Sequence, residues 1–203
     1  KPRGIVCTTS DKDRAENIVD FLHYPVRIYP VGRLDKDSSG LILMTNDGEI
    51  VNKILRGSNY HEKEYVVRVN QPLTGEFLDR MRSGVEILDT VTRPCKVEKT
   101  GGYTFRITLT QGLNRQIRRM CDALGYRVVS LKRVRIMNIR LGDLASGAYR
   151  EITGEEKKEL ERLLGDSDSR PGGRERRPQR PEEQVETGKG KRIWRTRSNG
   201  SES

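Results

Sequence analysis

Residues 32–45 of the chain read Gly-Arg-Leu-Asp-Lys-Asp-Ser-Ser-Gly-Leu-Ile-Leu-Met-Thr. The first nine residues predict a polar loop bounded by glycines, and the last five predict a buried β-strand. Binding and catalytic groups often lie on loops that a rigid scaffold holds in place. Asp35 and Asp37 would also suit an ordinary turn, in which an aspartate accepts hydrogen bonds from nearby backbone. The loop is therefore the first candidate site, and the rest of the chain has to separate these two interpretations.

The composition of the 203 residues favours a partner rich in phosphate. Lysine and arginine number 39 against 29 acidic residues, which gives a net charge of +10. Such an excess favours nucleic acid, because neutralising phosphates releases counterions. Charge alone does not separate an enzyme acting on RNA from a passive binder, or from a basic surface that serves solubility.

Several classes of site and location are excluded by what the sequence lacks. No apolar run approaches the roughly 20 residues that span a bilayer, and no signal peptide is recognisable. The three cysteines are far apart in the sequence and the chain has two histidines, so a zinc site is not expected. We expect a cytoplasmic protein with no membrane contact, no metal ion and no cofactor.

Hydrophobic periodicity predicts many short strands mixed with helices. Strands are expected over 26–31, 41–45, 63–69, 85–88, 91–98, 103–110 and 126–141. Helices are expected over 18–22, 49–56, 74–83, 113–124 and 153–165, with capping boxes at Ser10–Asp13 and Thr153–Glu156. Since strands and helices do not alternate strictly, the pattern indicates an α+β domain built on a largely antiparallel sheet.

The composition changes at residue 166. Residues 166–203 are rich in Gly, Pro, Arg and Glu, carry a net charge of +3 and have few strongly apolar residues. Such a segment buries too little apolar surface to offset the loss of chain entropy on folding. We expect a folded domain over 1–165, with a net charge of +7, followed by a disordered basic tail that serves either as an auxiliary RNA arm or for solubility.

Four segments then occur in a recognisable order. Residues 32–41 resemble the Asp-bearing motif of pseudouridine synthases, and 63–65 resemble their Lys-x-Tyr motif. Residues 111–120 are similar to the basic helix motif of the RsuA/RluB/RluE/RluF branch, and 1–4 match the family's first motif. The resemblance implies the catalytic fold of that family, a mixed, mostly antiparallel sheet flanked by helices. Family members usually also carry an N-terminal S4 RNA-binding domain, which we expect this chain to lack.

The resemblance implies an isomerase that converts uridine to pseudouridine in 23S ribosomal RNA and acts as a monomer; a tRNA anticodon-loop uridine is an open second substrate. Asp35 would be the nucleophile or base, because one carboxylate suffices in a site shielded from water. Arg118 would keep Asp35 ionised, and Tyr65 would stack on the target base. Asp37 is expected to shape its own turn.

The remaining basic residues are expected to bind RNA. Arg33 would hold the flipped uridine or contact phosphate, and Lys36 lies in the same loop. Arg115 and Arg119 fall on the helix face opposite the apolar one and would contact phosphate. Lys132, Arg133 and Arg135 would follow the RNA backbone from a basic strand. A different interpretation is an inactive RNA-binding module, such as a ribosome assembly factor; a basic nuclease lacks the expected metal-binding carboxylates or histidine pair.

Overall fold

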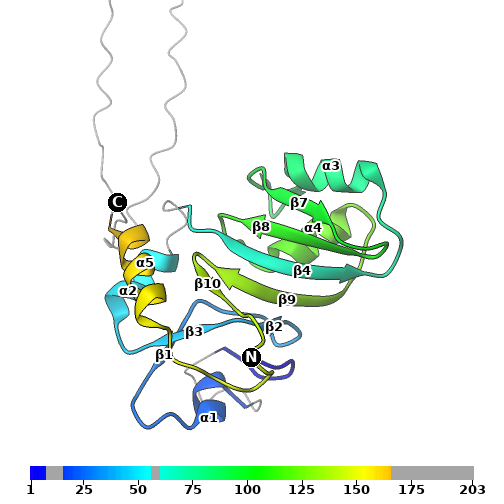
Figure 1. The fold of residues 1–203 in the computed structure, drawn as a ribbon. Helices are drawn as coiled ribbons and strands as arrows, with labels where there is room; N and C mark the ends of the chain where they lie inside the picture. The colour runs from blue at the N-terminus through cyan, green and yellow to red at the C-terminus, as the bar shows by residue number, and fades with distance from the viewer. Residues whose placement is uncertain (8–15, 56–59, 166–203) are drawn as a thin grey trace, which may run out of the picture. The chain divides into compact units, whose positions relative to one another are not determined.

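The computed structural model describes residues 1–7, 16–55 and 60–165, and its centre is a mixed β-sheet (Figure 1). Five strands lie side by side in the order β10 (Ile139–Arg140), β9 (Val128–Ile136), β4 (Lys63–Val69), β8 (Thr104–Leu109) and β7 (Lys96–Lys99), each antiparallel to its neighbours. A sixth, β2 (Ser39–Gly40), runs parallel to β9. The predicted α+β fold on a mostly antiparallel sheet is confirmed.

Two helices cover one face of this sheet, α3 (Gly75–Ser83) and α4 (Gln116–Ala123). Successive side chains of a strand point to opposite faces. On β4, Tyr65 and Val67 lie opposite Ile107 and Phe105 of β8, and all four contribute to the core beneath the helices. From α4, Ile117, Met120 and Cys121 enter the same core. Tyr65 therefore lies on the α4 face of the sheet.

A second apolar core forms around a two-stranded antiparallel sheet of β1 (Tyr29–Val31) and β3 (Leu43–Thr45). Val31 and Leu41 pack there against Ile136 and Ile139 from the end of the central sheet. Helices α2 (Gly48–Leu55) and α5 (Gly154–Leu164) close this core, while α1 (Ile18–Leu22) lies beside β1. A hairpin of β5 (Glu86–Ile87) and β6 (Thr90–Val91) completes the elements over the residues described.

Most predicted elements are present, with differences at their ends. The capping box at Thr153–Glu156 is confirmed. The strand predicted over 91–98 is interrupted around Pro94, which lacks the N–H that a ladder needs. The helix predicted from residue 113 begins at Gln116, because Arg115 has a left-handed backbone with φ of 49°. The capping box at Ser10–Asp13 and the tail at 166–203 lie outside the described residues.

The other face of the central sheet carries a cluster of ion pairs around Glu64. This carboxylate is 8% exposed and pairs with Arg106 and with Arg135, whose Nε lies 3.0 Å from Glu64 Oε2. Burial raises the pKa of the Glu64 carboxyl, but the hydrogen bonds from the two guanidinium groups outweigh this effect and lower it. Glu64 therefore stays charged and ties β4 to both neighbouring strands.

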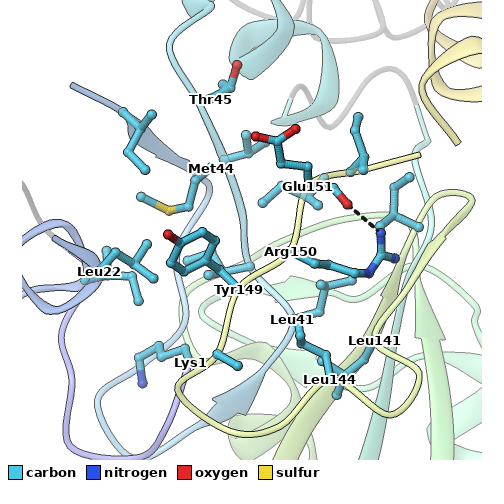
Figure 2. A pocket seen from close by; sticks show the side chains of 18 of the residues that line it. Lys1, Leu22, Leu41, Met44, Thr45, Leu141, Leu144, Tyr149, Arg150 and Glu151 are labelled. Carbon is cyan, nitrogen blue, oxygen red and sulfur yellow. Dashed lines mark hydrogen bonds between the residues drawn. The ribbon is translucent and has the colours of Figure 1, made fainter. Parts of the chain in front are cut away.

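A cavity of about 690 Å³ lies between the β1–β3 sheet and residues 141–152 (Figure 2). Its lining is mostly apolar, with Leu41, Met44, Leu144 and Tyr149 among the side chains that border it. Asp35, Tyr65 and Arg118 do not line it. The cavity meets the 33–41 loop at Ser39–Leu41 and does not reach the three candidate catalytic side chains. Among the residues described, no helix is long and apolar enough to span a bilayer.

Candidate active site

The loop that carries Asp35 is held from one side by the first residues of the chain. Lys1 Nζ donates to the carbonyl oxygens of Ser38, at 2.7 Å, and of Asp35, at 3.2 Å. The Lys1 main-chain amine donates to Gly40 O, at 2.9 Å, and Gly4 N donates to Lys36 O, at 2.8 Å. The segment that resembles the family's first motif thus fixes the backbone of the loop.

The end of the loop lies directly against β9. Gly40 has φ of +109°, and a β-carbon there would come within 2.2 Å of Arg133 O. Leu41 N donates to that same carbonyl oxygen, at 2.8 Å. Only glycine satisfies both the positive φ and the close approach without strain.

Arg133 supports the loop from inside the protein. Its guanidinium donates to Leu41 O, at 2.7 Å, and to Arg33 O, at 3.5 Å, so it contacts the two ends of the loop. The residue is 2% exposed. This placement is a correction to the predicted RNA-binding set, because a guanidinium buried under the loop does not face a ligand backbone. Arg135 is withdrawn from that set as well, since its guanidinium is held by Glu62 and Glu64.

Helix α4 brings two arginines to the loop. Arg118, 8% exposed, donates through Nη2 to Ser38 Oγ, at 3.1 Å, and to Asp37 O, at 3.2 Å. Arg115 was expected to face away, but its left-handed backbone turns it toward the loop, where Nη1 lies 3.3 Å from Asp35 Oδ2 and 3.4 Å from Asp37 Oδ1. The helical period gives no signal for this orientation, since Arg115 lies just outside the helix.

Asp35 remains partly open to solvent beside the more enclosed Arg118, whose side chain is 10% exposed. The Asp35 side chain is 34% exposed, and its Oδ2 lies 3.9 Å from Arg118 Nε. Within the described part of the chain, Nε of Arg118 is buried without a hydrogen-bond partner. The predicted pairing of Asp35 with Arg118 is therefore present as a long ion pair, with a donor still available; catalytic contacts often tighten only when substrate binds.

Asp37 has a larger role than the predicted turn-former. Its carboxylate lies 3.2 Å from Arg118 Nη2 and 3.4 Å from Arg115 Nη1. Burial raises the pKa of the Asp37 carboxyl, but the hydrogen bond from Arg115 and the charge of Arg118 lower it below its usual value. Asp37 thus holds both arginines beside Asp35, and Ser38, 1% exposed, receives Arg118 from the same loop.

Tyr65 lies two strands away from the end of the loop. It pairs in register with Arg133, which in turn lies beside Gly40 in the parallel β2–β9 contact. Its side chain is half-buried and packs against the core under α4. The structure thus brings the predicted stacking residue to the same face of the sheet as Arg118, with part of it accessible.

Lys63 is a further charged group on that face, to which the sequence interpretation gave no role of its own. It lies two residues before Tyr65 and opposite Leu109. Burial lowers the pKa of Lys63 to about 8, and the positive charge of Arg133 acts in the same direction. Its Nζ donates to His61 O, at 3.3 Å.

The other predicted RNA-binding residues lie on the surface. Arg33, Lys36, Arg119 and Lys132 are all exposed, so they are free to meet a polyanion. Arg119 also donates to Asn114, through Nε to the carbonyl oxygen and through Nη2 to the side chain. No group of three or more His, Cys, Asp or Glu residues that could hold a metal ion occurs in the described ranges.

Comparison with known proteins places this geometry in a family. The family model described as RNA pseudouridylate synthase matches residues 1–123. The dual-specificity RNA pseudouridine synthase RluF of Salmonella typhi is 56% identical over 169 residues, which are 83% of this chain and 58% of that protein. The chain thus spans less than three fifths of the length of that relative.

More distant relatives agree with this assignment. The ribosomal large subunit pseudouridine synthase B of Bacillus subtilis is 37% identical over 170 residues, 80% of this chain and 70% of that protein. A crystal structure of a pseudouridylate synthase superposes with a TM-score of 0.73 at 33% identity, covering 80% of this chain and 70% of that one. The predicted resemblance to the RsuA/RluB/RluE/RluF branch is confirmed. The chain belongs to the RNA pseudouridylate synthase family.

Proposed function

We propose that the protein isomerises a uridine of large-subunit ribosomal RNA to pseudouridine, with Asp35 as the catalytic carboxylate. The observation that carries this proposal is the placement of Asp35 between two guanidinium groups, 3.3 Å from Arg115 Nη1 and 3.9 Å from Arg118 Nε, on a loop held at both ends. Nearby cations keep a carboxylate ionised, as a nucleophile or base requires.

The reaction breaks the N1–C1′ bond of the uridine, turns the base and forms a C5–C1′ bond. The proton on C5 leaves and N1 takes up a proton, so atoms and electrons balance without water or an oxidant. Asp35 acts first, by attack on C1′, by attack on the base or by removal of the 2′ proton. Arg118 favours the ionised form of the Asp35 carboxylate, which is the form that can act as nucleophile or base.

The surrounding residues bind and orient the nucleotide. Tyr65 stacks on the extruded base, since aromatic side chains stack on bases that have left their helix. Arg33 holds the flipped nucleotide or grips its phosphate, and Lys36, Arg119 and Lys132 contact phosphate. An RNA-binding module without activity would not need Asp35, Tyr65 and Arg118 together, and all three are present on one face.

The finer features of the proposal are a 23S rRNA target, a tRNA uridine as second substrate, a monomeric state and a cytoplasmic location. The relatives named for dual specificity and for the large ribosomal subunit support the first two. Size-exclusion chromatography with light scattering tests the third. Turnover on separate rRNA and tRNA transcripts tests the substrates.

The central experiment uses unmodified large-subunit rRNA transcribed in vitro. Pseudouridine is mapped after carbodiimide treatment for the wild type, Asp35→Asn and Asp37→Asn. We expect Asp35→Asn to lower the single-turnover rate by at least about 1,000-fold, because the amide is neither nucleophile nor base. Asp37→Asn keeps the catalytic carboxylate and should lose about tenfold or less. Equal rates for wild type and Asp35→Asn, or no product from the wild type on either RNA, would refute the proposal.

A further inference from the structure

An exposed aromatic ring lies at the end of the central sheet where β4 begins. Tyr60 is 59% exposed and has a left-handed backbone with φ of 54°. The guanidinium carbon of Arg93 lies over this ring, 4.2 Å from its centroid. A cation at that distance is attracted by the ring, which restrains both side chains. The Tyr60–Arg93 pair thus presents an ordered aromatic surface with a positive charge on it.

Hydrogen bonds connect this pair to the helix that serves the candidate active site. Arg93 N donates to Gln111 Oε1, at 2.5 Å, and Gln116 Nε2 donates to the same oxygen, at 3.3 Å. Gln116 is 4% exposed, opens α4 and accepts from Leu113 N, at 3.1 Å. The next residues toward the site are Arg115 and Arg118, which contact Asp35. The pair is therefore positioned by the segment that positions the catalytic cations.

The surrounding charges suit a polyanion. The acidic residue nearest in sequence, Glu62, is neutralised by Arg135 at 2.9 Å and by Lys96 at 3.6 Å. Lys96 itself remains exposed along its side chain. A ring combined with arginine and a neutralised neighbour is the chemistry that binds an unpaired nucleotide, where the ring stacks on the base and the cation meets the phosphate.

We propose that Tyr60, held by Arg93, is a stacking site for an unpaired base of the RNA substrate, distinct from the Tyr65 position where the target uridine reacts. The proposal rests on the RNA substrate of the proposed function. It assigns to residues 60 and 93 a share of substrate affinity and none of the chemistry. Stacking on a ring is tolerant of base identity, so this site anchors the strand beside the target and does not read its sequence.

A second pair in the same protein provides a matched control. Tyr103 is 43% exposed, and Arg68 lies 5.9 Å from its ring centroid. Arg68 is near the end of β4 and Tyr103 directly precedes β8, so this pair lies at the opposite end of the same two strands. No hydrogen bond described for it leads to α4. Tyr103→Ala therefore removes a similar exposed ring away from the catalytic helix.

The test measures filter binding of the unmodified large-subunit rRNA transcript to variants of the 203-residue chain. We expect Tyr60→Ala to weaken binding about tenfold, while Tyr60→Phe, Tyr60→Trp and Tyr103→Ala stay within about twofold of the wild type. Because stacking releases no counterions, the loss should be the same factor at about 50 and 200 mM salt. The saturating single-turnover rate should not change with Tyr60→Ala.

Several results would overturn the inference. Equal RNA affinity of Tyr60→Ala and Tyr103→Ala would contradict it. A loss of affinity with Tyr60→Phe as large as with Tyr60→Ala would also contradict it, because the ring would then not be the binding group. If Tyr60→Ala lowers the melting temperature, the inference is tested with Tyr60→Trp and Tyr60→Phe instead. Both variants keep an aromatic ring and must bind the RNA like the wild type. Binding and pseudouridine formation are separate readouts, so a wild type that binds in the expected manner but makes no pseudouridine contradicts the proposed function alone.

Discussion

The Cα of Gly40 lies so close to Arg133 that a β-carbon would approach the Arg133 carbonyl oxygen to 2.2 Å and its nitrogen to 2.5 Å. Both atoms belong to backbone in the middle of β9, which cannot move aside as a flexible side chain could. The Asp35 loop and the central sheet are therefore joined at a point that admits one residue type.

Gly40→Ala should consequently lower the free energy of unfolding by about 3 kcal/mol, from the strained φ and the forced contact together. Urea unfolding followed by circular dichroism measures the change. The matched control is Gly75→Ala, because Gly75 lies in α3 with open space around its Cα and an unstrained backbone. That variant should stay within about 1 kcal/mol of the wild type. Similar unfolding midpoints for both variants would contradict the tight contact.

Arg118→Met should lower the rate of pseudouridine formation by at least about 100-fold, because it removes the buried cation beside Asp35. Asp37 and Ser38 would also lose their partner, so a fall in stability is expected. Arg118→Lys should recover stability in part but little activity, since a lysine cannot span the two loop contacts at once. Arg119→Met, one residue along the same helix and exposed, is the control and should retain the wild-type rate at saturating RNA.

Lys132 and Arg133 are adjacent in sequence, but their substitutions should affect different properties. Lys132→Ala should change RNA binding, and Arg133→Met should change stability. Lys132→Ala should reduce the slope of log affinity against log salt by about one phosphate contact, with stability unchanged. Arg133→Met should cost about 3 kcal/mol of stability, because it leaves the carbonyl oxygens of Arg33 and Leu41 without their donor. Filter binding and urea unfolding of both variants give the comparison. A salt-slope change for Arg133→Met without loss of stability would restore the predicted RNA contact.

Lys63 should make stability depend on alkaline pH. Its pKa falls from 10.5 in the unfolded chain to about 8 in the folded protein, so between these values the unfolded state binds more protons. The free energy of unfolding should then rise with pH from about 8 to about 10.5, by on the order of 1–3 kcal/mol. Below pH 8 the destabilising effect of the buried Lys63 charge is fully present and does not change with pH.

Two buried cysteines have the opposite effect on the free energy of unfolding above pH 9, so the measurement needs a reference protein. Burial raises the pKa of Cys95 to about 11 and of Cys121 to about 12, which makes stability fall above pH 9. Urea unfolding of wild type and Lys63→Met between pH 7 and 10.5 isolates the lysine. As the pH rises, the free energy of unfolding of the wild type should increase relative to that of Lys63→Met. A difference that stays constant with pH would show that Lys63 is not buried as a charge.

The fold was predictable because local pattern determines which face of each element is buried. Alternation over 103–110 and the helical spacing around Met120 depend on which face is buried, and the structure confirms both elements. The Asp35 loop was predictable as a site only when four segments were considered together. Each segment alone is also consistent with an ordinary turn, strand or helix.

The arginines show where sequence interpretation fails. Arg133 and Lys132 look alike in a basic strand, yet one is buried and one exposed, because β-strand alternation turns one of them under a loop that is 92 residues or more distant in sequence. Arg115 was assigned to the wrong side since its direction depends on a left-handed backbone just before α4. Alternation along β9 separates Arg133 from Lys132, but only contacts with distant segments show which of the two lies under the loop and where Arg115 points.

The parallel pairing of β2 with β9 has a consequence for the order in which the protein matures on the ribosome. Loop residues 33–41 are synthesised before β9, and the carbonyl and guanidinium of Arg133 that hold them are added more than 90 residues later. Long-range contacts of this kind form late, after the entropy of closing the intervening chain has been overcome. A nascent chain that ends before β9 therefore contains Asp35 but lacks the support that gives the loop its shape, so the geometry of the candidate site is complete only after β9 has been made.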